Sequence, residues 1–279
     1  MQRSPSARWT TSERCRPFLP VFDAARAGEF GSWEQVETPF LRAMEQFDAS
    51  IASSIGTEMS DDEKSELSAD LQNGKGDFFN DLLAVLLQNC AGIDTLSTRS
   101  AVPGLIVPVH NLDGVYPSTG PIRFMLEAKM FGTPKHINSP KQKDAGRRGS
   151  ADIDKRVKEL AFKSIDLKGE YSRLRTAEGE GARTGGPGGG DITTWLRGQD
   201  PKIYFFIGVR VISQSDFERA IRWAATAEQV VDSVGVFCFE PVETGSYTKY
   251  RKRDDVPPSL QIERVLYKAC TDLQALAQL

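Results

Sequence analysis

The feature that most constrains the fold is a strand–helix–strand succession in the last third of the chain. Residues Lys202–Ser213 (KIYFFIGVRVIS) and Val234–Phe239 (VGVFCF) are apolar and rich in β-branched and aromatic side chains, which predicts two buried strands. Between them, Ser215–Asp232 has the spacing of an amphipathic helix. Two strands joined through a helix normally belong to one sheet, so this unit predicts an α/β fold with a mixed sheet.

A hairpin is predicted ahead of this unit. The run Gly104–Val109 (GLIVPV) predicts a strand that continues through His110–Tyr116. The segment Pro117–Pro121 (PSTGP) is typical of a turn, and Ile122–Phe131 (IRFMLEAKMF) predicts the next strand. We therefore expect these strands to lie side by side in the sheet.

Helices are predicted around these strands. Ser60, followed by three acidic residues, is a strong helix start, and we expect that helix to stop near Asn73–Gly74. A separate, deeply buried helix is expected to begin at Asp77 (DFFNDLLAVLLQNC), because its apolar residues cover most of its circumference. Further helices are expected at residues 33–55, at Asp152–Leu167 and from about Ser259 to Leu276.

These patterns predict a particular organisation of the chain. Residues 1–73 are expected to form an N-terminal helical region, within which residues 1–20 are frayed or depend on a partner for their order. Residues 74–279 are expected to form the α/β core, a central mixed β-sheet flanked by helices. The Gly-rich stretch near residues 175–190 predicts a mobile loop within that core.

Composition excludes two classes of protein. No apolar run approaches the ~20 residues that a membrane-spanning helix needs, so we expect no membrane association. The four cysteines form no close pair and the chain has only two histidines, so no zinc site can be assembled. We expect reduced, mostly buried thiols and a cytoplasmic location.

The net charge of −3 means that nucleic acid, if bound, must be held by a local basic surface.

Three charged residues of the hairpin indicate chemistry: Asp113, Glu127 and Lys129. Side chains two residues apart on a strand lie on one face, roughly 7 Å apart, and a hairpin can bring Asp113 alongside Glu127 and Lys129. A glutamate and a lysine within an apolar strand are costly unless they are paired or used. Carboxylates are suitable ligands for Mg²⁺, and a metal ion and a lysine together can activate water and stabilise charge on a phosphate. The three residues therefore predict metal-dependent hydrolysis of phosphodiester bonds.

The same residues resemble a known motif. Asp113 followed by Glu127-Ala128-Lys129 resembles the active-site motif of the PD-(D/E)xK nuclease superfamily, which includes many restriction endonucleases. The resemblance covers roughly residues 74–167, and it implies a restriction endonuclease-like core in which the motif lies on two neighbouring strands after a helix. Leu112 stands where the motif often has a proline.

The resemblance also implies an activity and a set of ligands. It implies an endonuclease that cuts double-stranded DNA with Mg²⁺, or Mn²⁺ in its place, bound by Asp113 and Glu127, while Lys129 orients water or stabilises charge. A third metal ligand would come from the preceding helix, where Asp77, Asn80 and Asp81 are the candidates and we assign Asp81. It further implies a homo-oligomer and a role in restriction or phage defence, with a partner protein of the defence system.

A basic stretch follows the hairpin. We expect seven of its residues to contact nucleic acid, through phosphates and therefore in a salt-dependent way: Lys135, Lys141, Lys143, Arg147, Arg148, Lys155 and Arg156. Further lysines follow in the same stretch, namely Lys158, Lys163 and Lys168. The alternative for these residues is an ordinary solvated loop and helix face.

Two alternatives to an active nuclease remain open. The first is a catalytically silent member of the same fold that binds nucleic acid or serves as an assembly subunit. The second is an unrelated α/β interaction protein, in which Glu127 and Lys129 form an ion pair on a solvated sheet face and Asp113 is a turn residue before Gly114.

Overall fold

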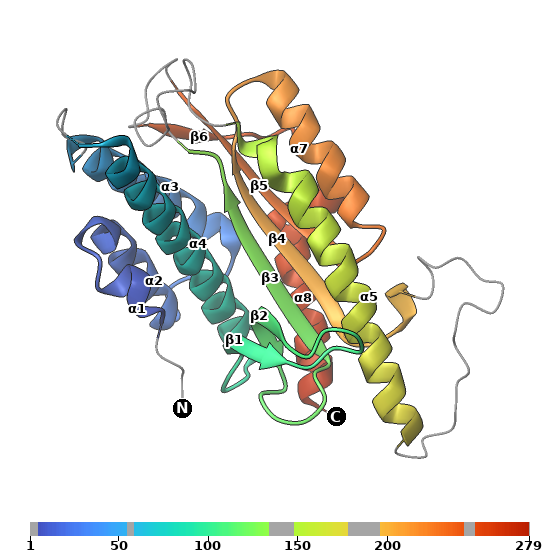
Figure 1. Ribbon diagram of the computed structural model, residues 1–279. Helices are drawn as coiled ribbons and strands as arrows, with labels where there is room; N and C mark the ends of the chain where they lie inside the picture. The colour runs from blue at the N-terminus through green and yellow to red at the C-terminus, as the bar shows by residue number, and fades with distance from the viewer. Residues whose placement is uncertain (1–4, 55–58, 134–147, 178–195, 243–248, 279) are drawn as a thin grey trace.

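A single mixed β-sheet forms the centre of the computed structural model (Figure 1). The structure describes residues 5–54, 59–133, 148–177, 196–242 and 249–278. Its six strands follow one another across the sheet in sequence order: β1 (Ser97–Val102), β2 (His110–Tyr116), β3 (Phe124–Phe131), β4 (Lys202–Arg210), β5 (Ser233–Pro241) and β6 (Tyr250–Lys252). β3, β4 and β5 are parallel, whereas β1–β2, β2–β3 and β5–β6 pair antiparallel. The predicted α/β class, with its mixed sheet, is therefore confirmed.

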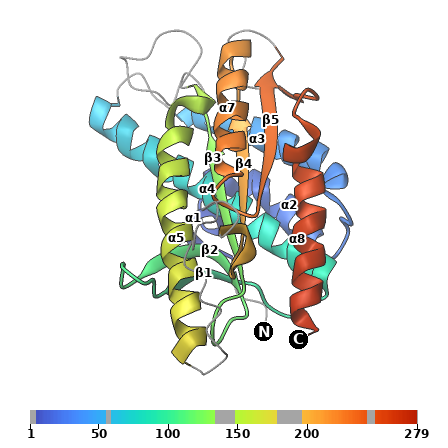
Figure 2. The same cartoon turned by 90° about the vertical axis from the view of Figure 1, so that its right-hand side faces the viewer.

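Helices cover both faces of the sheet (Figures 1 and 2). One face packs against α3 (Trp33–Ser54), α4 (Asp61–Ala91) and α8 (Ile262–Ala277), and the other against α5 (Ile153–Ala177) and α7 (Gln214–Ala227). The short helices α1 (Ala7–Thr10) and α2 (Leu19–Arg26) lie against α4 on its outer side. Three 3-10 turns complete the described elements: η1 (Glu13–Phe18), η3 (Gly149–Asp152) and η4 (Pro258–Leu260).

Burial on both faces explains the continuous apolar strands. Along β4, Tyr204 and Phe206 belong to the core beneath α4 and α8, whereas Ile203, Phe205 and Ile207 belong to the core beneath α5 and α7. A strand covered on both faces has no solvated side, so its sequence carries no polar alternation.

No helix in the described ranges is long and apolar enough to cross a membrane.

α4 differs from the prediction at its middle. The helix begins as expected, with Ser60 and Glu63 forming a reciprocal capping box, but it runs through Asn73–Gly74 and ends only at Gly92, whose φ is +65°. The expected stop at residue 73 is therefore wrong, and the expected boundary of the helical region falls inside one helix. Gly74 serves packing instead, because a Cβ there would stand 3.0 Å from the sulfur of Cys15.

The N-terminal segment is ordered by contacts with α4. Trp9 is fully buried, and its indole Nε1 donates to a carboxylate oxygen of Asp81 over 2.8 Å. The backbone N–H of Ser6 donates to the same oxygen, also over 2.8 Å. From residue 5 onward, the expected frayed terminus is therefore wrong, because an indole and a buried carboxylate give the segment a fixed position.

The first predicted strand is also misplaced. β1 is formed by the more polar segment Ser97–Val102, whereas Gly104–Val109 is a loop between β1 and β2. The backbone N–H groups of Ile106 and Val107 donate to the carboxylate of Asp166 on α5 rather than to a neighbouring strand. The Asp166 carboxylate thus accepts the backbone N–H groups that a neighbouring strand would otherwise bond.

The cysteines behave in two ways. Cys15 and Cys238 are free and buried, as expected, but Cys90 and Cys270 form a disulfide that joins the end of α4 to α8. The expectation of four reduced thiols is therefore wrong for this pair. The two cysteines of this disulfide are 180 positions apart in the chain, so their spacing in the sequence did not indicate the bond.

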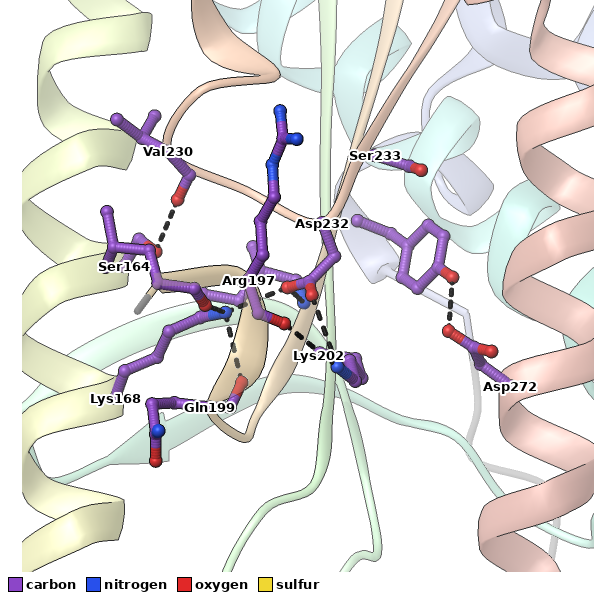
Figure 3. A network of polar contacts seen from close by, with 12 residues as sticks. Ser164, Lys168, Arg197, Gln199, Lys202, Val230, Asp232, Ser233 and Asp272 are labelled. Atoms are coloured by element: carbon purple, nitrogen blue, oxygen red, sulfur yellow. Dashed lines mark hydrogen bonds and ion pairs between the residues drawn. The ribbon is translucent and has the colours of Figure 1, made fainter. Parts of the chain in front are cut away.

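A buried lysine ties α5 to the lower end of the sheet (Figure 3). Lys168, which the sequence placed in the basic stretch, is fully buried, and burial lowers its pKa. Its Nζ donates to the backbone carbonyls of Leu196 and Gln199 and to the carboxylate of Asp232 at 2.9 Å. Asp232 in turn accepts the backbone N–H of Ile203 at the start of β4. Lys168 therefore cannot belong to a nucleic-acid-binding surface.

Loss of this lysine should destabilise the fold. Lys168→Ala leaves the Asp232 carboxylate buried with Lys202 as its remaining cation, and we expect unfolding to become easier by roughly 3 kcal/mol. Urea unfolding followed by circular dichroism measures this change. Lys158→Ala, an exposed substitution on the same helix, is the control and should shift stability by less than about 0.5 kcal/mol. Equal stability of the two variants would contradict the role given to Lys168.

Candidate active site

The site begins where β2 separates from β3. The two strands pair from Tyr116↔Phe124 to Gly114↔Leu126, where their pairing ends. At the next position the Asp113 carboxylate accepts the backbone N–H of Ala128 over 3.0 Å, in place of a strand partner. Within the described residues, β3 therefore has no strand paired on its β2 side beyond Leu126. Asp113 lies where this opening between the two strands begins.

A distortion of β2 accompanies this separation. On the neighbouring strand β1, Arg99 lies between the paired residues Thr98 and Ser100 and has a φ of +53°, an unusual conformation for a residue with a side chain. Leu112 and Val115 pack in the same core although they are three residues apart, so the regular alternation of the strand is broken between them. This break turns the Asp113 carboxylate towards β3.

The three predicted residues converge at the opening. Lys129 Nζ lies 2.6 Å from Asp113 Oδ2 and 3.0 Å from Glu127 Oε1. Both carboxylate oxygens are thus within 3.0 Å of one nitrogen, which places them at most about 6 Å apart. The structure therefore brings Asp113, Glu127 and Lys129 together, as the hairpin predicted.

A second lysine, from α5, joins them. Lys163 Nζ lies 3.0 Å from Glu127 Oε2 and 3.2 Å from its Oε1, and 3.4 Å from the carbonyl oxygen of Asn111. The sequence had indicated Lys163 only as one cation of the basic stretch, because its distance from Glu127 along the chain hides the contact. Lys163 holds Glu127 from the α5 side, while Lys129 holds it from β3.

The four charges balance in a largely desolvated place. Glu127 is buried, and the other three side chains are partly buried. Burial alone would lower the pKa of Lys129, but the charges of Glu127 and Asp113 and hydrogen bonds to both raise that pKa above its ordinary value. Lys129 is therefore held as a cation at neutral pH, so it can stabilise negative charge but is not poised to accept a proton.

Cavities open on both sides of Lys129. One, of about 430 Å³, is lined by Asp113 and Lys129 with Asp77 and Asn80 of α4. Another of about the same volume is lined by Glu127, Lys129 and Lys163. Arg156, at the start of α5, lines both cavities. A ligand can therefore approach the carboxylates from the α4 side and from the α5 side.

The helix-borne candidates occupy different places. Asn80 is buried and donates from Nδ2 to the carbonyl oxygen of Asp113 over 3.0 Å, and its Oδ1 has no hydrogen-bond partner among the described residues. Asp77 lines the first cavity but accepts the hydroxyl of Ser6 over 2.7 Å. Asp81 is taken by Ser6, by Trp9 and by Arg99, which lies 2.9 Å from its other oxygen. The structure therefore gives Asp81 no place among the other site residues, and Asn80 holds the position next to Asp113.

The donors fit a cation that prefers oxygen. In the described ranges, no group of three or more His, Cys, Asp or Glu side chains is arranged to hold a metal ion. The carboxylates of Asp113 and Glu127, which share the Lys129 ammonium, are nevertheless hard oxygen donors, and the buried amide oxygen of Asn80, which lies on the α4 side, has no partner among the described residues. Mg²⁺ commonly uses one or two carboxylates and keeps several waters. A divalent cation would compete with the Lys129 ammonium for the same carboxylate oxygens.

The predicted basic surface is only partly described. Lys135, Lys141, Lys143 and Arg147 lie outside the described residues, as does most of the Gly-rich stretch. Arg148 is exposed just before η3, and Lys155 and Arg156 are exposed on the first turns of α5, beside Glu159. Of these three predicted cations, Arg156 lines both cavities at the site.

Comparisons with known proteins identify no relative of this chain. No model of a protein family matches the chain, and neither the curated proteins nor the solved structures contain a match. The function must therefore be argued from the geometry of Asp113, Glu127 and Lys129.

Removal of the competing ammonium should strengthen metal binding. We expect Lys129→Met to bind Mn²⁺ roughly tenfold more tightly than the unaltered protein, because a cation no longer repels the metal from the carboxylates. Asp113→Asn and Glu127→Gln should weaken binding by at least that factor. Isothermal titration calorimetry measures all three, and Lys158→Met is the matched control. Unchanged Mn²⁺ affinity in both carboxylate variants would exclude this metal site.

Proposed function

We propose that this chain is a divalent-metal-dependent endonuclease that hydrolyses phosphodiester bonds of double-stranded DNA. The observation that carries the proposal is the convergence of Asp113, Glu127 and Lys129 at the opening between β2 and β3. Asp113 and Glu127 would hold Mg²⁺ or Mn²⁺, with Asn80 as the third oxygen donor in place of Asp81. When bound, the metal would lower the pKa of a water molecule and offset charge on the phosphate.

The chain's own residues have separate roles in this proposal. Lys129, kept protonated by its neighbours, orients the attacking water and stabilises the charge that develops on the phosphate. Lys163 fixes the Glu127 carboxylate from α5, and Asn80 fixes the backbone of Asp113 from α4. Glu127 and Asp113 are thus each held by a residue from a helix on a different face of the sheet, which favours a fixed geometry for the reaction.

The arrangement of the fold supports the same proposal. The motif resemblance implies two neighbouring strands that follow a helix within a mixed sheet, and β2 and β3 follow α4 in such a sheet. We therefore propose a restriction endonuclease-like core. Arg148, Lys155 and Arg156 would contact DNA phosphates next to the site. A homo-oligomer and a role in restriction or phage defence with a partner protein complete the proposal.

One observation favours a second candidate function. Glu127 is neutralised by two lysines, and Lys129 stands between the two carboxylates that would bind metal. A protein that binds nucleic acid, or assembles with other subunits, without cutting could use the same four charges as a structural network. Added Mg²⁺ or Mn²⁺ would cause the nuclease to cleave DNA, whereas this silent member of the same fold would cleave none with either metal.

A cleavage assay separates the two. Supercoiled plasmid is incubated with Mg²⁺ or Mn²⁺ and the unaltered protein, and relaxed and linear products are followed by gel electrophoresis. We expect Asp113→Asn, Glu127→Gln and Lys129→Met each to lower the rate by at least about 100-fold, because each removes a group that acts on the transition state. Chelation of the metal should abolish cleavage.

Controls make the outcome specific. Glu218→Gln, an exposed acid on α7, should cut like the unaltered protein. Equal cutting by the three site variants would refute the assignment of the site. Salt-sensitive DNA binding without cleavage, under either metal, would instead favour the silent candidate, and neither binding nor cleavage would favour an unrelated interaction protein.

A further inference from the structure

A group of exposed apolar side chains lies beside the proposed active site. Leu105, Ile106 and Val109 belong to the loop between β1 and β2, and Phe162 and Ile165 belong to α5; we call these five residues the apolar ridge. Their exposed fractions range from 41 to 69%, and they are five of the seven large hydrophobic residues exposed in the described part of the chain. Such clustering on one surface is typical of an interaction site rather than of scattered surface residues.

The loop that carries the ridge is held firmly to α5. The buried carboxylate of Asp166 accepts the backbone N–H groups of Ile106 at 2.6 Å and Val107 at 3.2 Å, and lies 2.6 Å from His110 Nε2. Gly104 allows this close approach, because a Cβ there would stand 2.0 Å from an oxygen of Asp166. The apolar side chains are thus presented to solvent by an ordered loop, which lowers the entropic cost of binding a partner.

The ridge is continuous with the site. Phe162 of the ridge, and Val107 of the loop that carries the ridge, line the same cavity as Glu127, Lys129 and Lys163. A ligand held at the carboxylates from the α5 side therefore reaches the ridge without leaving this surface.

Charge indicates which partner suits this surface. In the two helix turns before Phe162, the exposed side chains of α5 are Lys155, Arg156 and Lys158 against one acid, Glu159. A second copy of the chain would bring the same excess of positive charge to this surface and is therefore not the charge-complementary partner. Nucleic acid offers phosphates for the cations and the flat faces of bases for apolar side chains.

We infer that the apolar ridge inserts into the DNA at a base step next to the bond that is cleaved, with Ile106 and Leu105 as the inserting residues. The inference rests on the proposed nuclease function and adds to it a deformation of the substrate. Aliphatic side chains that enter a base step unstack it and bend the duplex. The protein would thereby select sites that unstack easily, such as pyrimidine–purine steps, without reading base edges.

Fluorescence of 2-aminopurine tests this inference, because unstacking brightens that base. Duplexes carry 2-aminopurine at single positions and are titrated with the cleavage-deficient Asp113→Asn protein. We expect a position-dependent increase in fluorescence. In the Asp113→Asn background, Ile106→Ser and Leu105→Ser should abolish the increase and weaken binding about tenfold, while the dependence of affinity on salt stays the same because phosphate contacts remain. Tyr267→Ser, a 74% exposed side chain on α8, is the matched control.

The outcomes distinguish this inference from the proposed function. If the unaltered protein cuts DNA, and Ile106→Ser and Leu105→Ser leave affinity and fluorescence unchanged, the ridge does not enter the duplex although the nuclease proposal stands. If ultracentrifugation shows that Ile106→Ser converts a dimer into a monomer with fluorescence unchanged, the ridge joins two copies and the inference is overturned. If the unaltered protein neither binds nor cuts DNA, both proposals fall. Thermal unfolding of each variant shows that loss of binding is not loss of fold.

Discussion

The hydrogen bond from Ala128 N–H to the Asp113 carboxylate is the interaction on which the site depends. It satisfies a backbone donor of β3 at the point where β2 no longer does, so the two strands can separate without leaving that donor unpaired. The separation opens the edge of β3, and the same carboxylate oxygen receives Lys129. A regular ladder at this position would pair Asp113 with Glu127 and close this edge of β3.

The charges around that opening are expensive to assemble. Partly buried carboxylates and ammonium groups lose hydration, and their mutual attraction offsets this loss only when the geometry is good. Here the Glu127 carboxylate is held by Lys129 of β3 and Lys163 of α5. The Asp113 carboxylate is held by Lys129 and the backbone N–H of Ala128, and the backbone carbonyl of Asp113 accepts the amide of Asn80. Such a network stabilises a fold poorly compared with apolar packing of the same volume, and so it is better explained by a function that uses the charges.

Much of the fold was predictable from the sequence because its signals are local. The strand–helix–strand unit, the hairpin partner β3 and the capped start of α4 follow from periodicity and from side chains a few residues apart. The errors share one cause. Gly74 resembles a helix end but makes room for Cys15, and the apolar run 104–109 resembles a strand but is bonded by Asp166. Trp9 near the terminus and the Cys90–Cys270 pair likewise depend on residues far away in the chain.

The residues of the candidate site also fall into those that local sequence patterns indicate and those that only long-range contacts identify. The sequence by itself determined that Asp113, Glu127 and Lys129 lie on neighbouring strands, because the alternation of a strand and the length of a turn set which side chains share a surface. Only the tertiary structure decided that Asn80 rather than Asp81 stands beside Asp113, that Lys163 joins the site and that Lys168 is buried. Periodicity records which residues of a helix are buried, but the packing of distant segments decides what each of them meets there.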